Sequence, residues 1–472
     1  MQLRKWQSEC ANRALEYFNA KRHHFLCLAT PAAGKTVMAS EVAAKLLERD
    51  LIDFVLCFSP SINISQGIKY TFSKRLKCRF DGVIGAIGCS YTYQSMLSFK
   101  EDFWQLLERN RVLVVFDEIH HCSGSSLEDA NAWGEEILLN IQNQAEYTLA
   151  LTGTPWRSDQ APIALSRYTD PDNQIQCDYI YGLKEAVTDG VCRNPKIVLI
   201  DNDEISVTDE DNETKTFNSL GDLFKGSAVP YQSVIKNDDA LRHILTLATD
   251  KLKIIKKVNP NAAGLIVSSS TEHAAYIFNM LKTEFNQTAQ IVTYKEDEPS
   301  HKINEFRNSS INWIVSVGMI SEGTDIPRLQ VCCHLSRVKT ELYFRQVLGR
   351  ILRMTTSVDQ QAWLFTFAEP KLVEFANRIA EEIPDQPVIF RNPVNVSLSE
   401  IVSLDKNEVM KDCISPIGNN KLEFGSSYKQ KPLQSNTLDT TRSKNIIGLI
   451  SQSFEILGGF RDKVVSTFDS PF

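Results

Sequence analysis

Long apolar runs are absent from this sequence of 472 residues. No stretch of about 18 uninterrupted apolar residues occurs, and the first twelve residues are polar and charged where a secretory signal would be apolar. We therefore expect neither a membrane-spanning segment nor an export signal. These absences favour a cytoplasmic protein that does not bind a membrane.

Paired cysteines and an excess of positive charge are also absent. The eleven cysteines are scattered and none forms a C-x-x-C pair, so a zinc ribbon or a disulfide scaffold is not expected. His120, His121 and Cys122 are adjacent, but three such side chains cannot all point at one ion from a regular element. The net charge of −7 argues against a protein that coats nucleic acid by bulk charge, yet it allows a local basic groove.

Apolar residues make up 43% of the chain, which is enough for two or three domains with buried cores. Short apolar runs alternate with helical-period stretches, a pattern typical of parallel strands with crossover helices. The expected strands are Phe25–Ala29, Phe54–Ser59, Val112–Phe116, Tyr147–Leu151, Gly264–Ser268, Ala289–Thr293, Trp313–Val317 and Leu329–Leu335. The expected helices are Thr36–Glu48, Asp239–Val258, Glu272–Glu284 and Glu341–Gly349.

We therefore predict an α/β protein with two tandem lobes, each a parallel sheet flanked by helices, and a small C-terminal extension. The first lobe is expected at 1–195 and the second at 239–384. Between them, 196–238 contains an acidic stretch, which indicates a linker or a solvated hairpin. The extension at 385–472 has no readable role, although its apolar segment Ile446–Phe460 is expected to form a helix that packs on the body.

The segment ATPAAGKT follows an expected strand and opens an expected helix, which is the context of a nucleotide-binding loop. Gly34 would let the backbone turn so that amides and the helix N-terminus face phosphate oxygens. Lys35 would neutralise the β- and γ-phosphates, and Thr36 would offer its hydroxyl to Mg²⁺. Ala32 and Ala33 complete the loop, although the strict pattern begins with Gly where this sequence has Ala. The alternative is a strand-turn-helix that binds no nucleotide.

A second candidate motif is the apolar strand Val112–Phe116, which runs directly into Asp117 and Glu118. In a parallel sheet both carboxylates would lie at the same edge as the phosphate loop. Asp117 would hold Mg²⁺ through water, and Glu118 would orient the water that attacks the γ-phosphate. The alternative is an N-cap followed by a first-turn acid on an ordinary helix.

From Leu3 to about Arg353, the order of these and further motifs resembles the DExH-type helicases of superfamily 2, in particular XPB-like and bacterial or phage DNA-repair translocases. The resemblance implies two RecA-like lobes, ATP and Mg²⁺ as cofactors, and nucleic acid as partner. In the first lobe it implies an adenine contact for Gln7 and coupling between ATP and strand binding for Thr152 and Thr154. It also implies nucleic-acid contacts for Pro60, Ser61, Tyr93 and Gln94.

In the second lobe, the resemblance implies contacts to the nucleic-acid backbone from Ser270 and Thr271. The segment EGTDIP is similar to a family motif in which a Thr faces nucleic acid and an Asp faces the nucleotide. Those positions are Thr324 and Asp325 in this chain.

The string QVLGRILR is the most specific motif of the second lobe. Arg350 and Arg353 are three residues apart and would share one helical face, and a planar guanidinium suits the spread charge of a phosphoryl transition state. The resemblance makes them arginine fingers and implies that Gln346 contacts the γ-phosphate or water. The alternative is a surface helix with solvated arginines.

These motifs favour an ATP-dependent helicase or translocase that acts on DNA in repair, recombination or phage defence, alone or with protein partners. An RNA helicase is the first alternative, but Ile119 and His120 stand where DEAD-box RNA helicases have Ala and Asp. The second is an ATP-gated subunit of a defence complex that binds nucleic acid without unwinding it. The third, a binding module without ATPase activity, is disfavoured because the expected catalytic residues are all present.

Overall fold

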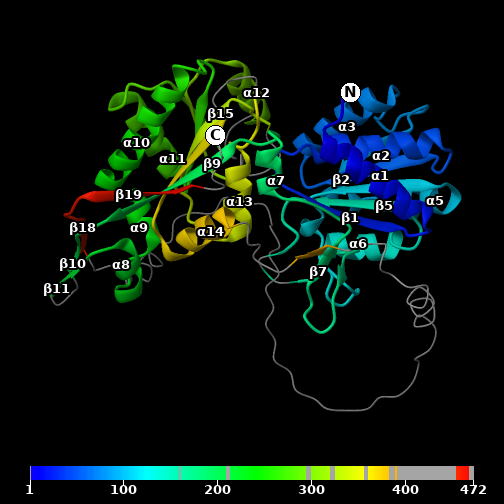
Figure 1. Ribbon diagram of the computed structural model, residues 1–472, viewed down its shortest axis with the longest axis horizontal. Helices are drawn as coiled ribbons and strands as arrows, with labels where there is room; N and C mark the ends of the chain where they lie inside the picture. Colours follow the sequence, from blue (N-terminus) through cyan, green and yellow to red (C-terminus); the bar gives the residue numbers. More distant parts are fainter. Residues whose placement is uncertain are drawn as a thin grey trace, which may run out of the picture. The chain divides into compact units, whose positions relative to one another are not determined.

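The computed structural model describes residues 2–157, 159, 161–208, 213–293, 299–318, 325–355, 360–381, 388–390 and 453–466. Nearly all of them belong to one compact unit, Met1–Val207, Lys215–Arg391 and Phe454–Phe472. The second unit, Thr208–Thr214 and Asn392–Ser453, lies almost wholly outside the described residues. The compact unit contains two large sheets with helices on their faces (Figure 1), so the predicted α/β class with two parallel-sheet lobes is confirmed.

The first lobe is built on a six-stranded parallel sheet in the order β3-β2-β4-β5-β1-β8. Its strands are β1 (His24–Ala29), β2 (Phe54–Ser59), β3 (Gly88–Thr92), β4 (Val112–Asp117), β5 (Tyr147–Thr152) and β8 (Tyr179–Tyr181). Its helices are α1 (Lys5–Asn19), α2 (Lys35–Glu48), α3 (Ile62–Leu76), α4 (Tyr93–Met96), α5 (Glu101–Arg109), α6 (Ala132–Asn140) and α7 (Leu183–Thr188), with a 3₁₀ turn at Ile119–His121.

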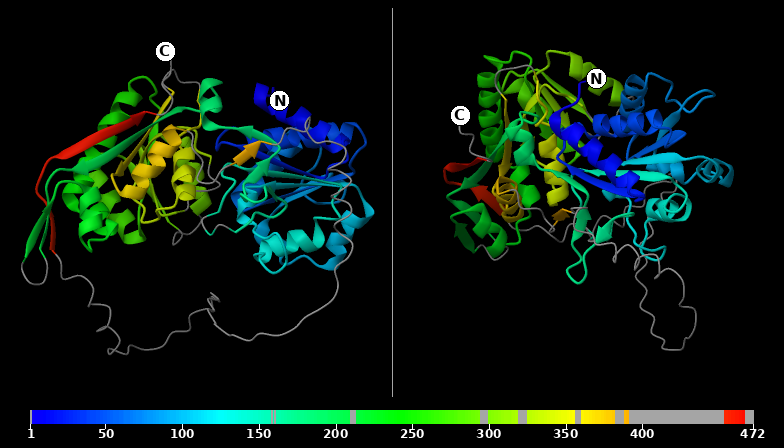
Figure 2. Two further views of the ribbon diagram at one scale, coloured as in Figure 1. Left: turned by 60° about the horizontal axis from the view of Figure 1, so that its bottom comes forward. Right: turned by 45° about the vertical axis from the view of Figure 1, so that its right-hand side comes forward.

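The central strand β4 shows why this sheet forms. All six of its residues are buried, because helices cover both faces of the sheet. Val112 and Val114 pack in the core beneath α4, α5 and α6, whereas Leu113 and Val115 pack in the core beneath α1, α2 and α3. Figure 2 shows these helix layers from two further directions. A continuous apolar run is what a strand buried on both faces requires.

The second lobe has a seven-stranded sheet in the order β13-β14-β12-β15-β16-β9-β19, parallel except for β19. Its strands are β9 (Asn194–Asn202), β12 (Ala263–Val267), β13 (Ala289–Val292), β14 (Trp313–Ser316), β15 (Leu329–His334), β16 (Gln361–Phe367) and β19 (Phe460–Ser466). Its helices are α8 (Leu220–Gly226), α9 (Tyr231–Lys236), α10 (Asp238–Lys256), α11 (Thr271–Thr283), α12 (Pro299–Asn308), α13 (Glu341–Gly349) and α14 (Pro370–Ala380).

Two small sheets complete the described residues. One joins β11 (Thr214–Phe217), β10 (Ile205–Thr208) and β18 (Ser453–Ile456), and the other joins β17 (Val388–Phe390), β7 (Ile175–Cys177) and β6 (Arg167–Tyr168). Within the described part of the chain, no helix combines the length and the apolar character needed to cross a bilayer.

The expected linker at 196–238 is wrong over much of its length. β9 pairs with β16 from Asn194 to Ile200, so this segment is a strand of the second sheet. Its residues 197–200 are all buried, and their apolar character outweighs the acidic residues that follow. Helices α8 and α9 also fall in this range, and β10 and β11 are neighbouring strands of a small sheet where the acidic residues suggested a hairpin.

The helix expected at Ile446–Phe460 is also wrong where the structure describes it. Residues 453–456 form β18, and Phe460 begins β19, while 446–452 lie outside the described residues. In β18, Phe454 and Ile456 are half-buried and alternate with exposed residues, which is the period of a strand and not of a helix. β19 pairs antiparallel with β9, and this pairing accounts for the strand.

A contact between β12 and β14 predicts a local sensitivity in the second sheet. The indole of Trp313 is fully buried over Gly264, and a Cβ atom at Gly264 would lie 2.1 Å from that ring. Gly264→Ala should therefore lower the melting temperature, with a cost of about 1–3 kcal/mol from overpacking. The matched control is Gly67→Ala in α3, where a Cβ meets nothing within 4 Å and should be neutral or stabilising. Equal melting temperatures for the two variants would contradict this packing.

Candidate nucleotide-binding site

The loop between β1 and α2 has the backbone shape of an anion cradle. Ala32 and Gly34 both adopt left-handed conformations, with φ of 69° and 93°. Between them the amide of Ala33 donates to the carbonyl of Thr30 at 3.2 Å, and α2 begins at Lys35. Successive turns of this kind direct backbone amides to one side, at the positive end of a helix.

The side chains of Gln7, in α1, and Arg4, the residue before α1, hold this loop through its backbone carbonyls. The Gln7 amide donates to the carbonyl of Gly34 at 2.9 Å, and the Arg4 guanidinium donates to the carbonyl of Ala33 at 2.7 Å. Gln7 also accepts the backbone amide of Arg4 at 2.9 Å. Gln7 thus lies at the phosphate loop, while its expected contact to adenine stays a prediction. Arg4 was not singled out from the sequence, although it lies in the same short segment.

A half-buried ion pair joins the loop to the end of β4. The ammonium of Lys35 lies 3.1 Å from Oε1 of Glu118, and Lys35 is only 8% exposed. The other carboxylate oxygen of Glu118 accepts the amide of Gly153 at 3.1 Å. Burial alone would raise the pKa of Glu118, but Lys35, His120 and the Gly153 amide outweigh it and lower the pKa. Glu118 is therefore a carboxylate at neutral pH.

Asp117 differs from its neighbour because, among the described residues, no cation forms an ion pair with it, although Lys35 and His121 lie near enough to lower its pKa in part. Burial and the adjacent charge of Glu118 raise the pKa of Asp117. Its Oδ1 atom is buried and has no hydrogen-bond partner among the described residues. An unsatisfied buried carboxylate oxygen is costly, and a divalent cation or its bound water would satisfy it. The predicted Mg²⁺ therefore fits this position, with the hydroxyl of Thr36 on the first turn of α2 as a second candidate ligand.

Thr152 and Thr154, the expected coupling residues, lie beside the same carboxylates. Both are buried at the end of β5, and the hydroxyl of Thr152 accepts the Thr154 amide at 3.0 Å. That hydroxyl also lies 2.9 Å from Nδ1 of His120 and 3.5 Å from Oε2 of Glu118. The Thr-Gly-Thr turn is thus connected to Glu118 through one hydroxyl and one backbone amide.

α13 brings the predicted arginine segment to the phosphate loop. Gly349 lies so close to Pro31 that a Cβ atom there would be 2.7 Å from the Cβ of Pro31. Gln346 lies on this helix and Arg350 ends it, both half-buried. Arg353 forms an ion pair with Asp325 at 2.5 Å, which joins two residues that the sequence assigned to separate motifs.

Cys192 lies beside both segments, and its backbone pairs with that of Arg353 in an isolated bridge. Burial raises the pKa of Cys192 to about 12, and the positive charges of Arg4, Arg353 and Lys35 partly offset that rise. Cys192 also lies against the phosphate loop, where its thiol contacts the carbonyl of Pro31 at 3.6 Å. Charges from both lobes therefore act on one thiol beside this loop.

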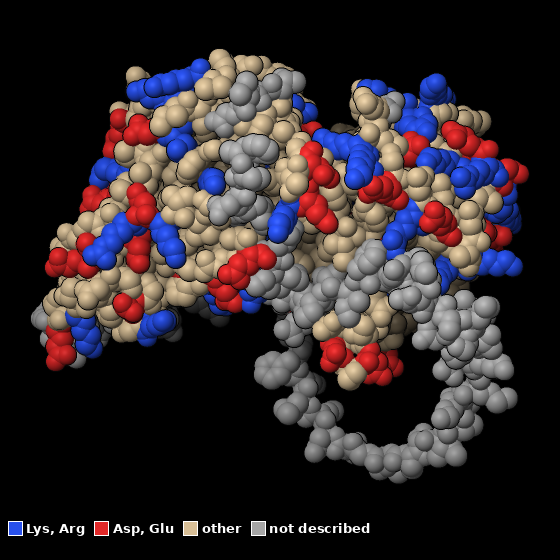
Figure 3. Space-filling view, in the orientation of Figure 1, with Lys and Arg blue, Asp and Glu red and all other residues tan. Residues whose placement is uncertain are grey.

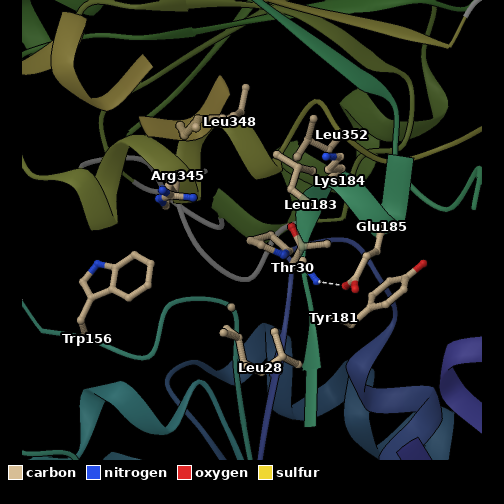
Figure 4. Close-up of a pocket in the computed structure, with 15 residues that line it drawn as sticks. Leu28, Thr30, Trp156, Tyr181, Leu183, Lys184, Glu185, Arg345, Leu348 and Leu352 are labelled. Carbon is tan, nitrogen blue, oxygen red and sulfur yellow. Dashed lines mark hydrogen bonds between the residues drawn. The ribbon is translucent and has the colours of Figure 1, made fainter. Parts of the chain in front are cut away.

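A cavity of about 440 Å³ lies between the phosphate loop and α13. Figure 4 shows Arg345, Leu348 and Leu352 facing it from the second lobe, with Leu28 and Thr30 facing it from the first. The guanidinium of Arg345 lies 5.4 Å from the ring of Trp156, which follows the Thr-Gly-Thr-Pro turn, and forms an ion pair with Glu341 at 2.6 Å. The sequence analysis missed Arg345 and Trp156, although each is adjacent to a motif residue.

Arg193 is a further residue that the sequence analysis missed. Its side chain is fully buried, and its guanidinium donates to the carbonyls of Leu329 at 2.6 Å, Pro327 at 3.1 Å and Ile351 at 3.2 Å. Its amide donates to the carbonyl of Leu352 at 2.8 Å. Arg193 thereby fixes the segment after Asp325 to the segment before Arg353. A single arginine before an apolar strand carries no motif that could have revealed this role.

One expected nucleic-acid contact is contradicted by burial. Tyr93 is fully buried, its hydroxyl donates to the carbonyl of Asp117 at 2.8 Å, and its ring stacks on Trp133 with centroids 5.7 Å apart. Tyr93 therefore supports the end of β4, and its buried side chain is not available to contact nucleic acid. Its neighbour Gln94 is exposed.

The other expected nucleic-acid residues lie at helix ends. Ser61 caps α3 directly after Pro60, and Ser270 caps α11, where its hydroxyl accepts the amide of His273 at 3.1 Å. The hydroxyl of Thr271 donates to Glu272 at 2.8 Å. Helix N-termini suit phosphate contacts, which stay predictions here. Thr324 lies outside the described residues.

Comparison with protein families gives two matches. Residues 1–157 match the family described as "Type III restriction enzyme, res subunit", and residues 245–355 match the "Helicase conserved C-terminal domain". The first range contains the phosphate loop and both acids, and the second contains the Gln346–Arg353 string.

Individual proteins are similar over most of the chain. A protein of Mycobacterium tuberculosis is 30% identical over 80% of the chain, which spans 63% of that relative's length. The DNA 3'-5' translocase XPB2 of Sulfurisphaera tokodaii is 23% identical over 75% of the chain and 79% of its own length. A fragment structure assigned to the HsdR subunit of a type I restriction enzyme from Vibrio vulnificus has a TM-score of 0.54 and 16% identity, over 82% of this chain and 68% of that one. The last likeness is one of fold alone.

Substitutions of Lys35 and Glu118 test their predicted roles, which are phosphate binding for Lys35 and orientation of the attacking water for Glu118. Lys35→Ala should abolish ATP turnover and weaken ATP binding, because the positive charge for the phosphates is lost. Glu118→Gln should lower turnover by about 10²–10⁴-fold, the range typical of a lost general base, yet keep ATP binding. Steady-state hydrolysis and titration with a fluorescent nucleotide measure the two effects. Glu135→Gln, an exposed change in the same lobe, is the control. Retained turnover in either site variant would contradict the assigned roles.

Proposed function

Since this chain belongs to superfamily 2 of the helicases and carries their ATP-hydrolysing domains, we propose that it is an ATP-driven motor that moves along DNA or separates its strands. The observation that carries the proposal is the approach of α13 to the phosphate loop, where Gly349 contacts Pro31. Lys35, Asp117 and Glu118 lie on one side of that contact, and Gln346, Arg350 and Arg353 come from the segment on the other side.

The chain's own residues divide the work of hydrolysis between the two sides. Lys35 binds phosphate oxygens, and Glu118 leaves its ion pair with Lys35 to orient the attacking water and accept its proton. Thr36 and Asp117 would hold Mg²⁺, which supplies charge neutralisation at the phosphate oxygens when bound. Arg350 and Arg353 stabilise the charge that spreads over the transferred phosphoryl group.

Movement follows if the binding and release of nucleotide change the contact between the two sides. The Thr-Gly-Thr turn contacts Glu118 through Gly153 and Thr152. A shift of Glu118 during hydrolysis would therefore be transmitted directly to the end of β5. On the second lobe, Arg193 ties the segment of Arg353 to that of Asp325. These two connections would transmit closure to strand contacts on each lobe, so that the lobes grip alternately.

DNA is the proposed substrate in preference to RNA. The relative from Sulfurisphaera tokodaii is named as a DNA translocase, and the family matched by residues 1–157 is named for a restriction enzyme. The strand contacts expected at Pro60, Ser61 and Ser270 would be to phosphates, so no base sequence would be preferred. Repair, recombination or phage defence are the processes that such a motor would serve, alone or with protein partners.

Nucleic-acid dependence tests this proposal. ATP hydrolysis should be measured with no nucleic acid, single-stranded DNA, forked DNA and RNA in parallel, together with displacement of a labelled strand. We expect stimulation by DNA and ATP-dependent displacement or translocation. Stimulation by RNA alone would favour an RNA helicase, and stimulation without strand movement would favour a subunit that only binds nucleic acid.

The arginine fingers give a second test. Arg350→Lys and Arg353→Lys should each lower DNA-stimulated turnover by roughly 10³-fold or more, because lysine keeps the charge but loses the planar fork. The affinity for ATP should change much less. Arg337→Lys, an exposed change in the same lobe, is the control. If both finger variants turn over ATP as fast as the parent chain, the arginines do not take part in the reaction.

A further inference from the structure

The proposed function does not use a basic surface that lies on the first lobe. From Phe54 to Phe80 the chain has five Lys or Arg residues and no Asp or Glu, although the whole protein carries a net charge of −7. These basic residues lie on α3 and the turn that follows it. In Figure 3, Lys and Arg side chains line the upper rim of the part of the molecule that carries α3 in Figure 1.

Three of the five charges are uncompensated. Arg75 forms ion pairs with Glu41 and Glu48, and Arg79 forms one with Asp81. Lys69, Lys74 and Lys77 have no carboxylate at ion-pair distance among the described residues, and the last two are exposed. We call Lys69, Lys74 and Lys77 the α3 lysines. Uncompensated charges on an acidic protein favour a polyanionic partner.

An exposed aromatic ring lies among the α3 lysines. Tyr70 is 68% exposed, and the ammonium of Lys74 lies 5.8 Å from the centre of its ring. Lys69, Tyr70, Lys77 and Arg79 line one open hollow of about 610 Å³. Aromatic rings among lysines are typical of surfaces that bind nucleic acid.

The turn after α3 presents an apolar tip next to the same hollow. Val83 is 53% exposed and Ile84 is 96% exposed, between Gly82 and Gly85, which both have positive φ. The tip is braced, because Val83 donates its amide to Asp81 at 3.2 Å and Gly82 donates its amide to the carbonyl of Gly88 at 3.2 Å. Apolar side chains held rigidly outward beside lysines can insert at a base step or cap a terminal base pair.

We propose that the α3 lysines and the Val83–Ile84 tip form a surface for duplex DNA, which holds the double-stranded flank of the strand in the motor. This inference rests on the proposed function. α3 begins at Ser61, where the strand contact is expected, and a helix rises about 1.5 Å per residue. Tyr70 is therefore about 14 Å and Lys77 about 24 Å along the helix from Ser61. That span corresponds to roughly four to seven base pairs of duplex.

The test compares two DNA probes on the full chain. One is a short single strand, and the other is the same strand extended by one helical turn of duplex. The variant Lys69→Gln, Lys74→Gln, Lys77→Gln removes three charges but keeps the side-chain stems. Its matched control is Lys253→Gln, Lys257→Gln, Lys282→Gln on the second lobe, where all three lysines are exposed.

For the extended probe, the slope of log affinity against log salt concentration should become less steep by about 2–3 in the α3 variant. Each lost phosphate contact reduces this slope by roughly 0.9. Affinity for the short single strand, and the ATPase activity that it stimulates, should match the control. The pair Val83→Ser, Ile84→Ser should keep affinity but lose any rise in fluorescence of 2-aminopurine placed at the duplex end.

The outcomes separate this inference from the proposed function. If DNA stimulates hydrolysis but the α3 variant and its control show equal salt dependence on the extended probe, the surface is wrong and the motor stands. If the α3 variant weakens both probes equally, the lysines contact the single strand and the duplex assignment is overturned. If no nucleic acid stimulates the parent chain, both proposals fall.

Discussion

The ion pair between Lys35 and Glu118 is the interaction on which the site depends. A buried lysine requires a negative partner, and in the described residues that partner is the carboxylate expected to orient the attacking water. Nucleotide phosphates would replace Glu118 as the partner of Lys35 and so free the carboxylate for its role. The same pair helps to explain why the two acids differ. Burial raises the pKa of both, but Lys35 contacts Glu118 directly and lowers its pKa, whereas the adjacent charge of Glu118 raises the pKa of Asp117 further. Glu118 is thus kept charged, whereas the buried carboxylate of Asp117 requires a bound cation.

The rest of the molecule positions groups around this pair. Gln7 and Arg4 hold the phosphate loop by its carbonyls, and Tyr93 holds β4 by the carbonyl of Asp117. On the second lobe, Arg193 satisfies the carbonyls of Leu329 and Ile351, where an unpaired buried polar group would be costly. These supporting residues all make hydrogen bonds to backbone carbonyls. Their loss would displace the groups of the proposed site without removing any of them.

Much of the fold could be predicted because buried parallel strands have a simple signature. β2 and α13 have the bounds that the apolar runs and helical period indicated, and the phosphate loop was found from its place between strand and helix. β9 was missed because acidic residues follow it and only the pairing with β16 shows that it is a strand. Tyr93 was assigned to the wrong face because a motif gives no direction for a side chain. The role of Arg193 could not be predicted from the sequence, because its partners are backbone carbonyls of distant segments that come together only in the fold.

The central claim is that one nucleotide is held by two lobes of the same chain. It is tested most directly by mixing Lys35→Ala chains with Arg350→Ala chains and measuring DNA-stimulated ATP hydrolysis. If each chain builds its own site, the mixture will be as inactive as either variant alone at every ratio and concentration. Recovery of turnover on mixing would show that the arginine of one chain serves the phosphate loop of another, and would contradict the account.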